Sequence, residues 1–97
     1  MSNDENEKLL KLASWIMISS YRNRVMIALG GKFKTPSTLA RESGIRSNHI
    51  SKVLRELKDE KLVVCINEEA KKGRLYKVTD LGNKVMKKAK ALNEPIL

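Results

Sequence analysis

Apolar residues at helical spacing make residues 47–60 the most clearly patterned part of the chain. Ile50, Val53, Leu54 and Leu57 fall at positions i, i+3, i+4 and i+7, and most of the residues between them are polar. Because this spacing puts the four side chains on one face, it predicts an amphipathic helix that buries that face.

A shorter helix is predicted just before this one. Thr35 can cap it, because its hydroxyl can accept a free backbone N–H, and Pro36 suits the first helical position. Ala40, Gly44 and Ile50 then follow in the order that two crossing helices require: a small residue, a turn and an apolar plug. This spacing is typical of a DNA-binding helix-turn-helix, and an ordinary pair of antiparallel helices is the alternative.

Residues 5–19 are predicted to form a helix with apolar residues over much of its circumference. One face carries Leu9, Leu12, Ala13 and Ile16. Further apolar residues lie off that face: Leu10, Trp15 and Ile18. We therefore expect this helix to contact both its own domain and a second copy of the chain. The alternative is that it only completes the core.

A short helix over residues 21–29 is expected next, with Ser20 as its N-cap and Gly30-Gly31 at its end. In the linker that follows, Phe33 is expected to fill the core.

A compact apolar run over residues 62–66 and a run of alternating polar and apolar residues over 74–78 flank a polar loop over residues 67–73. They predict a β-hairpin with a basic tip that carries Lys71, Lys72 and Arg74. Two strands are marginal alone, so the hairpin must pack on the helices.

A last helix is predicted after Thr79, its expected N-cap. Its apolar side carries Leu81, Val85, Ala89 and Leu92. The two end helices hold more apolar surface than a small core needs, and we expect them to form a dimer interface. The expected interface residues are Leu9, Leu12, Trp15, Ile16, Val85, Ala89 and Leu92.

This order of elements predicts a mainly α fold with a small β-hairpin (α+β), a winged helix-turn-helix with additional N- and C-terminal helices. The expected division is an N-terminal helix over residues 1–20, a DNA-binding domain over residues 21–79 and a C-terminal helix over residues 80–97. The chain resembles the small MarR/ArsR-like winged-helix transcriptional regulators of archaeal type. The similar segments are SSYRNRVMIAL, TPSTLARESGI, HISKVLRELKDEKLVVC and KKGRLYKVTDLG.

The resemblance implies sequence-specific binding of double-stranded DNA as a homodimer and regulation of transcription. The chain differs from the metal-sensing members because it has no cysteine pair. A small-molecule effector therefore stays an open question.

The charge of the chain agrees with a polyanionic partner. The formal net charge is +9, and ten basic residues against four acidic ones lie in residues 22–61. A basic chain is often merely soluble, but here the excess charge coincides with the predicted helix-turn-helix.

The face of the residue 47–60 helix opposite its apolar stripe carries the expected DNA contacts. Asn suits adenine, and Arg or Lys suits guanine, in the major groove. The expected contacts on this helix are Ser47, Asn48, Ser51, Lys52 and Arg55. For His49, a phosphate contact and a packing role stay open. Additional backbone or minor-groove contacts are expected from Thr35, Ser37, Lys71, Lys72 and Arg74.

Several function classes lack support in the sequence. Cys65 and His49 are the only residues of their types, so we expect no disulfide, no metal site and no cofactor, and Cys65 is expected to be a buried strand residue. The acidic, polar N-terminus does not resemble a signal peptide, and no apolar run is long enough to span a membrane, so a cytoplasmic protein is expected. No arrangement of nucleophile and base suggests an enzyme. The alternative function is a winged-helix adaptor between proteins in a transcription or replication assembly.

Overall fold

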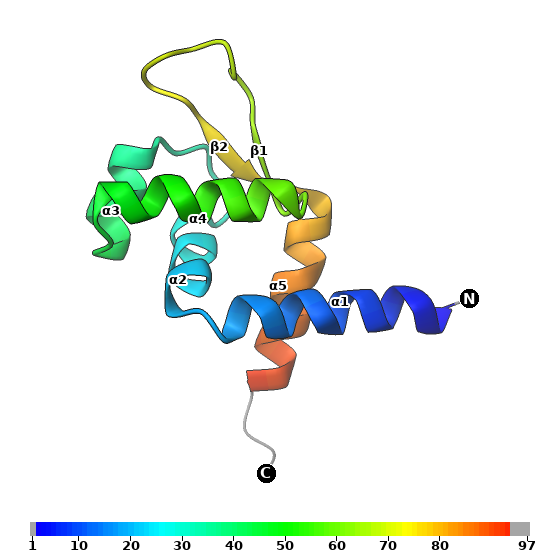
Figure 1. Ribbon diagram of the computed structural model, residues 1–97. Helices are drawn as coiled ribbons and strands as arrows, with labels where there is room; N and C mark the ends of the chain where they lie inside the picture. The colour runs from blue at the N-terminus through cyan, green and yellow to red at the C-terminus, as the bar shows by residue number, and fades with distance from the viewer. Residues whose placement is uncertain (1, 94–97) are drawn as a thin grey trace.

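The computed structural model describes residues 2–93 of the chain, and side chains from residue 4 onward. It is mainly helical with one small antiparallel hairpin, as the α+β prediction required. The elements are α1 (Ser2–Met17), α2 (Ser20–Leu29), α3 (Pro36–Ser43), α4 (Ser47–Asp59), β1 (Val63–Cys65), β2 (Tyr76–Val78) and α5 (Asp80–Asn93). Figure 1 shows α1 crossing α5, with α2 between α1 and α4 and the hairpin at the end opposite the C-terminus.

Side-chain caps fix where the helices begin. The Thr35 hydroxyl accepts the N–H of Thr38 at 3.2 Å, and Pro36 stands at the first position of α3, as predicted. The Thr79 hydroxyl accepts the N–H of Gly82 at 3.0 Å, which confirms it as the cap of α5. For α2 the prediction was wrong by one residue. Ser19 is the cap and accepts the Arg22 N–H at 3.3 Å, because its backbone is already extended.

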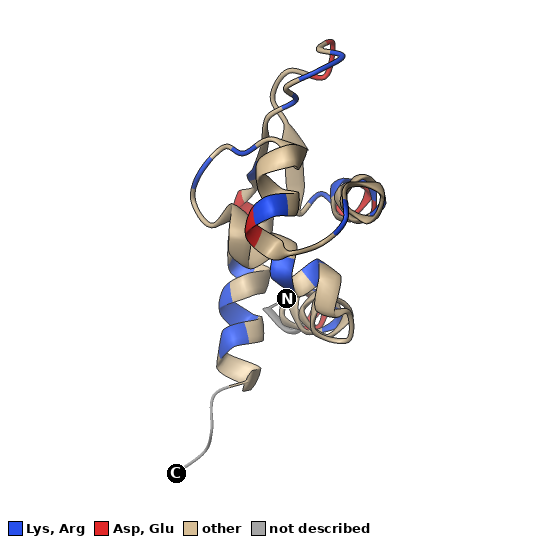
Figure 2. Ribbon diagram, turned by 90° about the vertical axis from the view of Figure 1, so that its left-hand side faces the viewer, with Lys and Arg blue, Asp and Glu red and all other residues tan. Residues whose placement is uncertain are grey.

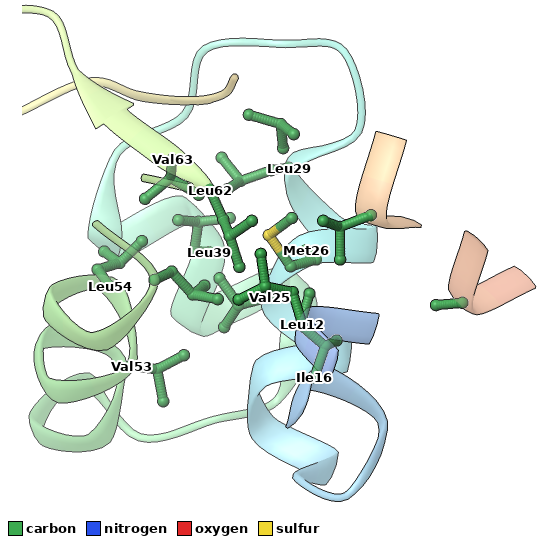
Figure 3. Close-up of a cluster of buried hydrophobic side chains, with 14 of the residues drawn as sticks. Leu12, Ile16, Val25, Met26, Leu29, Leu39, Val53, Leu54, Leu62 and Val63 are labelled. Atoms are coloured by element: carbon green, nitrogen blue, oxygen red, sulfur yellow. The ribbon is translucent and has the colours of Figure 1, made fainter. Parts of the chain in front are cut away.

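One apolar cluster holds all the elements together (Figure 3). It includes the predicted stripe of α4, since Ile50, Val53, Leu54 and Leu57 are all buried. It also takes side chains from α1, α2, α3, α5 and both strands. The helices at the two ends of the chain therefore share a core with the segment between them.

The structure corrects the expected dimer interface. Leu12, Ile16, Val85 and Ala89 are buried inside this single chain, because α1 and α5 cross and cover each other's apolar faces. These four side chains therefore have almost no surface to offer a second copy, since each is at most 9% exposed. Leu9 and Trp15 are partly buried against the same core, and Leu92 is 49% exposed.

The hairpin is shorter than predicted and gains an unpredicted neighbour. Its register pairs Val63 with Val78, Val64 with Lys77 and Cys65 with Tyr76. Cys65 is buried, as predicted. On the other side of β2, the backbone N–H of Lys34 donates to Tyr76 O at 3.0 Å, and the Tyr76 N–H donates to Lys34 O at 2.9 Å. The linker between α2 and α3 thus adds a third short extended segment.

This pairing explains why the prediction for Phe33 was wrong. Side chains alternate along an extended segment, and Lys34 turns inward, where its ammonium bonds Ala28 O and Glu42 Oε1. Phe33 therefore points outward and is 48% exposed, with Lys77 Nζ 5.0 Å from its ring centroid. In residues 2–93, no helix has the length and apolar character needed to cross a membrane.

Candidate nucleic-acid interface

The helix α4 presents a polar face to solvent along its whole length. Its apolar side chains are held in the core, so the side chains on the opposite face are exposed. The exposed residues are Ser47, Asn48, Ser51, Lys52, Arg55 and Asp59. The structure therefore leaves all five side chains predicted to contact DNA from this face free of the core.

The position of α4 is set by the turn that joins it to α3. Gly44 adopts the left-handed conformation at φ 72°, where a side chain would be strained, and its N–H donates to Ala40 O at 3.0 Å. Arg24 of α2 donates from Nε to Ser43 O at 3.1 Å and ties the same turn to a third helix. Ile45 is buried just after the turn. These contacts fix α4 against α2 and α3.

The hairpin loop, which we define as residues 66–75, carries the predicted cluster of Lys71, Lys72 and Arg74, all exposed. Asn67, which the sequence analysis did not single out, organises this loop. Its Oδ1 accepts the Leu75 N–H at 2.8 Å, and its Nδ2 donates to Gly73 O at 3.2 Å. An Asn at the start of a Gly-containing loop is the signal that could have identified it.

An ion pair connects the hairpin loop to α4. Lys58 and Glu68 form it, and both side chains are on the surface. The hydrogen bond from Lys58 lowers the pKa of Glu68, and the same bond raises the pKa of Lys58. Sequence reasoning missed this pair, because its partners lie on different elements.

The structure separates the predicted contacts into two groups along α4. Ser51 and Arg55 line a hollow together with Lys71 and Arg74 of the hairpin loop. His49 and Lys52 instead line a smaller depression beside the start of α2. Ser37 is exposed at the start of α3, whereas the Thr35 hydroxyl is already occupied by Thr38.

His49 packs on Tyr21 of α2. Their ring centroids are 5.4 Å apart with a tilt of 49°, and the His49 side chain is half-buried. Of the two roles that the sequence left open, the structure shows the packing contact. Tyr21 also lies under the guanidinium of Arg24 at 5.7 Å from the ring centroid. Sequence reasoning missed Tyr21 as a neighbour of the α4 face.

Basic residues outnumber acidic ones around this face. Figure 2 shows both basic and acidic residues on the hairpin loop at the top, and it shows a separate group of basic residues along α5 at the lower left. Within residues 4–93, no group of three His, Cys, Asp or Glu side chains gathers closely enough to hold a metal ion. No protein-family model, curated protein or solved structure matches this chain.

Proposed function

We propose that this protein is a sequence-specific regulator that binds double-stranded DNA through a winged helix-turn-helix. In this proposal α3 and α4 are the two motif helices, and α4 enters the major groove. The hairpin is the wing, and its loop contacts the backbone or the adjacent minor groove. The observation that carries the proposal is the polar face of α4, whose Asn48, Lys52 and Arg55 are exposed beside the basic hairpin loop.

The pairing of Lys34 with Tyr76 supports the winged arrangement. It ties the segment before α3 to the second strand, which anchors the base of the hairpin beside the motif. A hairpin anchored next to α4 suits a duplex, because one element can enter the groove while the other follows the backbone.

A homodimer is part of the proposal, with an interface different from the one expected from sequence. The surplus apolar surface lies at the end of α1, on α2 and on α5. Its exposed side chains are Met17, Ile18, Ile27 and Leu92. Of these, Met17 and Ile27 line one hollow, and Ile27 is 64% exposed, whereas Ile18 is 80% exposed. An exposed apolar surface of this kind favours contact with a second protein surface. A two-fold dimer would present α4 twice, to successive major grooves about 34 Å apart.

Selection of bound sequences from a random DNA pool tests the function. We expect a pseudo-palindrome with half-sites roughly 10 base pairs apart. With roughly 6–10 phosphate contacts, the slope of log K against log salt should be on the order of −5 to −9. No enriched sequence, together with a flat salt response, would contradict DNA binding.

Sedimentation tests the dimer. Ile27→Glu should shift the chain from dimer to monomer, because it buries a charge in the proposed contact. Val64→Glu is the matched control, since Val64 is an exposed apolar residue on the hairpin. A native chain that stays monomeric at high concentration would refute the dimer.

The alternative function is a protein–protein adaptor. The observation that favours it is the outer face of the hairpin and its linker, where Phe33, Val64 and Ile66 are exposed. An adaptor would bind its partner through these side chains and would show no sequence preference for DNA.

A further inference from the structure

A hollow lies between α4 and the hairpin loop, with a volume of about 310 Å³. Figure 1 shows the loop rising beside α4 at this place. The side chains that matter for its chemistry are Ser51, Arg55 and Lys58 from α4, Lys71 and Arg74 from the loop, and Tyr76 from β2. The lining therefore combines hydroxyl groups and cations from separate elements and contains no carboxylate.

Three of the four cations that line the hollow have no directly paired carboxylate within residues 4–93. Lys58 is paired with Glu68, and the same carboxylate also attracts Arg74 from beyond ion-pair distance. Among the residues whose side chains the structure describes, no carboxylate lies within ion-pair distance of Arg55, Lys71 or Arg74. Three like charges that converge on one hollow repel each other, so an anion bound between them would lower the electrostatic free energy.

The loop cations are held in place before any ligand binds. Arg74 donates from Nε to Ala70 O at 2.7 Å, which fixes the base of its guanidinium while its terminal nitrogens stay available. Asn67 bridges the two ends of the loop, and Glu68 connects the loop to α4 through Lys58. A site whose groups are already positioned loses less conformational entropy when it binds.

We propose that this hollow binds one phosphodiester group of the DNA backbone, held by Arg55 of α4 and by Lys71 and Arg74 of the hairpin loop. The inference rests on the proposed function and assigns Arg55 a role different from the guanine contact expected from sequence. A base edge offers its acceptors to one side chain, whereas the two charged oxygens of a phosphate can satisfy several cations.

The position of Arg55 along α4 agrees with this role. It lies seven residues beyond Asn48, about 10 Å farther along the helix axis. The N-terminal residues of a recognition helix approach the base edges, which leaves base reading to Asn48 and Lys52. Arg55 then sets the register of α4 on the duplex by holding a phosphate.

Uncharged methylphosphonate groups, placed one at a time along the selected duplex, test the assignment. Arg55→Gln should weaken binding about tenfold on every sequence, make the salt slope shallower by about 1 and leave the preferred sequence unchanged. One methylphosphonate position in each half-site should weaken binding by the wild-type chain and cause a clearly smaller loss in Arg55→Gln and in Arg74→Gln, because each variant already lacks one of the three cations that hold this phosphate. Lys77→Gln is the control, because Lys77 is exposed on the same hairpin but does not line the hollow.

The opposite outcome is equally clear. The inference is wrong, and Arg55 reads a base, if two results are found together. Arg55→Gln alters the preferred base at one position, and every methylphosphonate weakens DNA binding by this variant as much as it weakens binding by the wild type. Titration with dimethyl phosphate, followed by NMR of the free chain, separates this failure from failure of the proposed function. If the chain binds no DNA but dimethyl phosphate changes chemical shifts only around the hollow, the anion site stands and DNA binding is refuted. If the chain binds no DNA and no chemical shift changes, both proposals are refuted.

Discussion

The helices α4 and α5 look alike in sequence and differ in what surrounds them. They have 13 and 14 residues, and each combines an apolar stripe with several cations on its other sides. The outer face of α4 adjoins the hairpin loop, which adds further cations to it. On α5, Lys87 and Lys90 instead border an apolar hollow of about 610 Å³, which Ile27, Met86 and Ala89 help to line.

This difference shows that basic charge alone does not identify a DNA-binding face. On α5, Lys84 Nζ lies 3.6 Å from Glu5 Oε1, and Lys87 and Lys90 lie beside apolar side chains. On α4, Arg55 stands among cations from a second element. The first setting suits a contact with an amphipathic surface, and the second suits a polyanion. Substitutions in the two helices and in the hairpin loop can test this contrast.

The apolar residues of the two helices should differ most. Leu57→Ala in α4 removes a fully buried side chain and should cost about 2–5 kcal/mol of unfolding free energy. Leu92→Ala in α5 removes a half-exposed side chain and should stay within about 0.5 kcal/mol when both changes are made in the Ile27→Glu chain, where the proposed dimer contact is already broken. Urea denaturation of both variants measures the difference. Equal losses would show that Leu92 has a packing role within the single chain.

The start of α5 should tolerate no added methyl group. A Cβ on Gly82 would lie 2.3 Å from Leu62 O and 2.6 Å from Val78 Cγ1, so Gly82→Ala must shift backbone and should cost about 1–3 kcal/mol. Gly31→Ala is the control, since a Cβ there meets nothing within 4 Å. Thermal unfolding of the pair checks the prediction, and a neutral Gly82→Ala would mean that α5 can move away from the hairpin.

The polar residues of the two helices should differ in DNA binding. Asn48→Ala on α4 should cost about 1–3 kcal/mol at one base position and relax the preference there. The double variant Lys87→Gln, Lys90→Gln on α5 should keep the same preferred sequence and almost the same affinity, because charges more than about 8 Å from the phosphates are screened at physiological salt. Binding to a set of single-base operator variants measures both. A larger loss from the α5 variant would reverse the assignment of the two helices.

The ion pair that connects α4 to the hairpin loop should have the smallest effect. The pKa of Glu68 is lowered in the folded chain, so its ionised carboxylate stabilises the fold at pH values above its ordinary pKa of 4.5. This stabilisation is lost as the pH falls through the lowered pKa. Amide chemical shifts of the hairpin loop should therefore change below about pH 4.5 in the wild type. In Glu68→Gln they should already resemble the acid form at neutral pH. Unchanged shifts in Glu68→Gln would show that the pair does not hold the loop.

Features that depend on residues a few positions apart could be predicted from the sequence. The stripe of α4, the caps at Thr35 and Thr79 and the turn at Gly44 were all predicted correctly. Each follows from residues within about two turns of helix, whose geometry is nearly fixed once the helix forms. The exposed face of α4 followed in the same way, since burying four apolar residues leaves the opposite side in solvent.

Which surfaces pack against each other could not be predicted from the sequence. The sequence showed that α1 and α5 are apolar but assigned their faces to a second copy, whereas the two helices bury Ile16 and Val85 within one chain. Neither the outward orientation of Phe33 nor the hollow between Arg55 and the hairpin loop could be predicted from the sequence. An apolar stripe shows that a helix face must be buried, but it does not show which surface covers that face. The partner is set by how the whole chain packs, through contacts between residues far apart in the sequence.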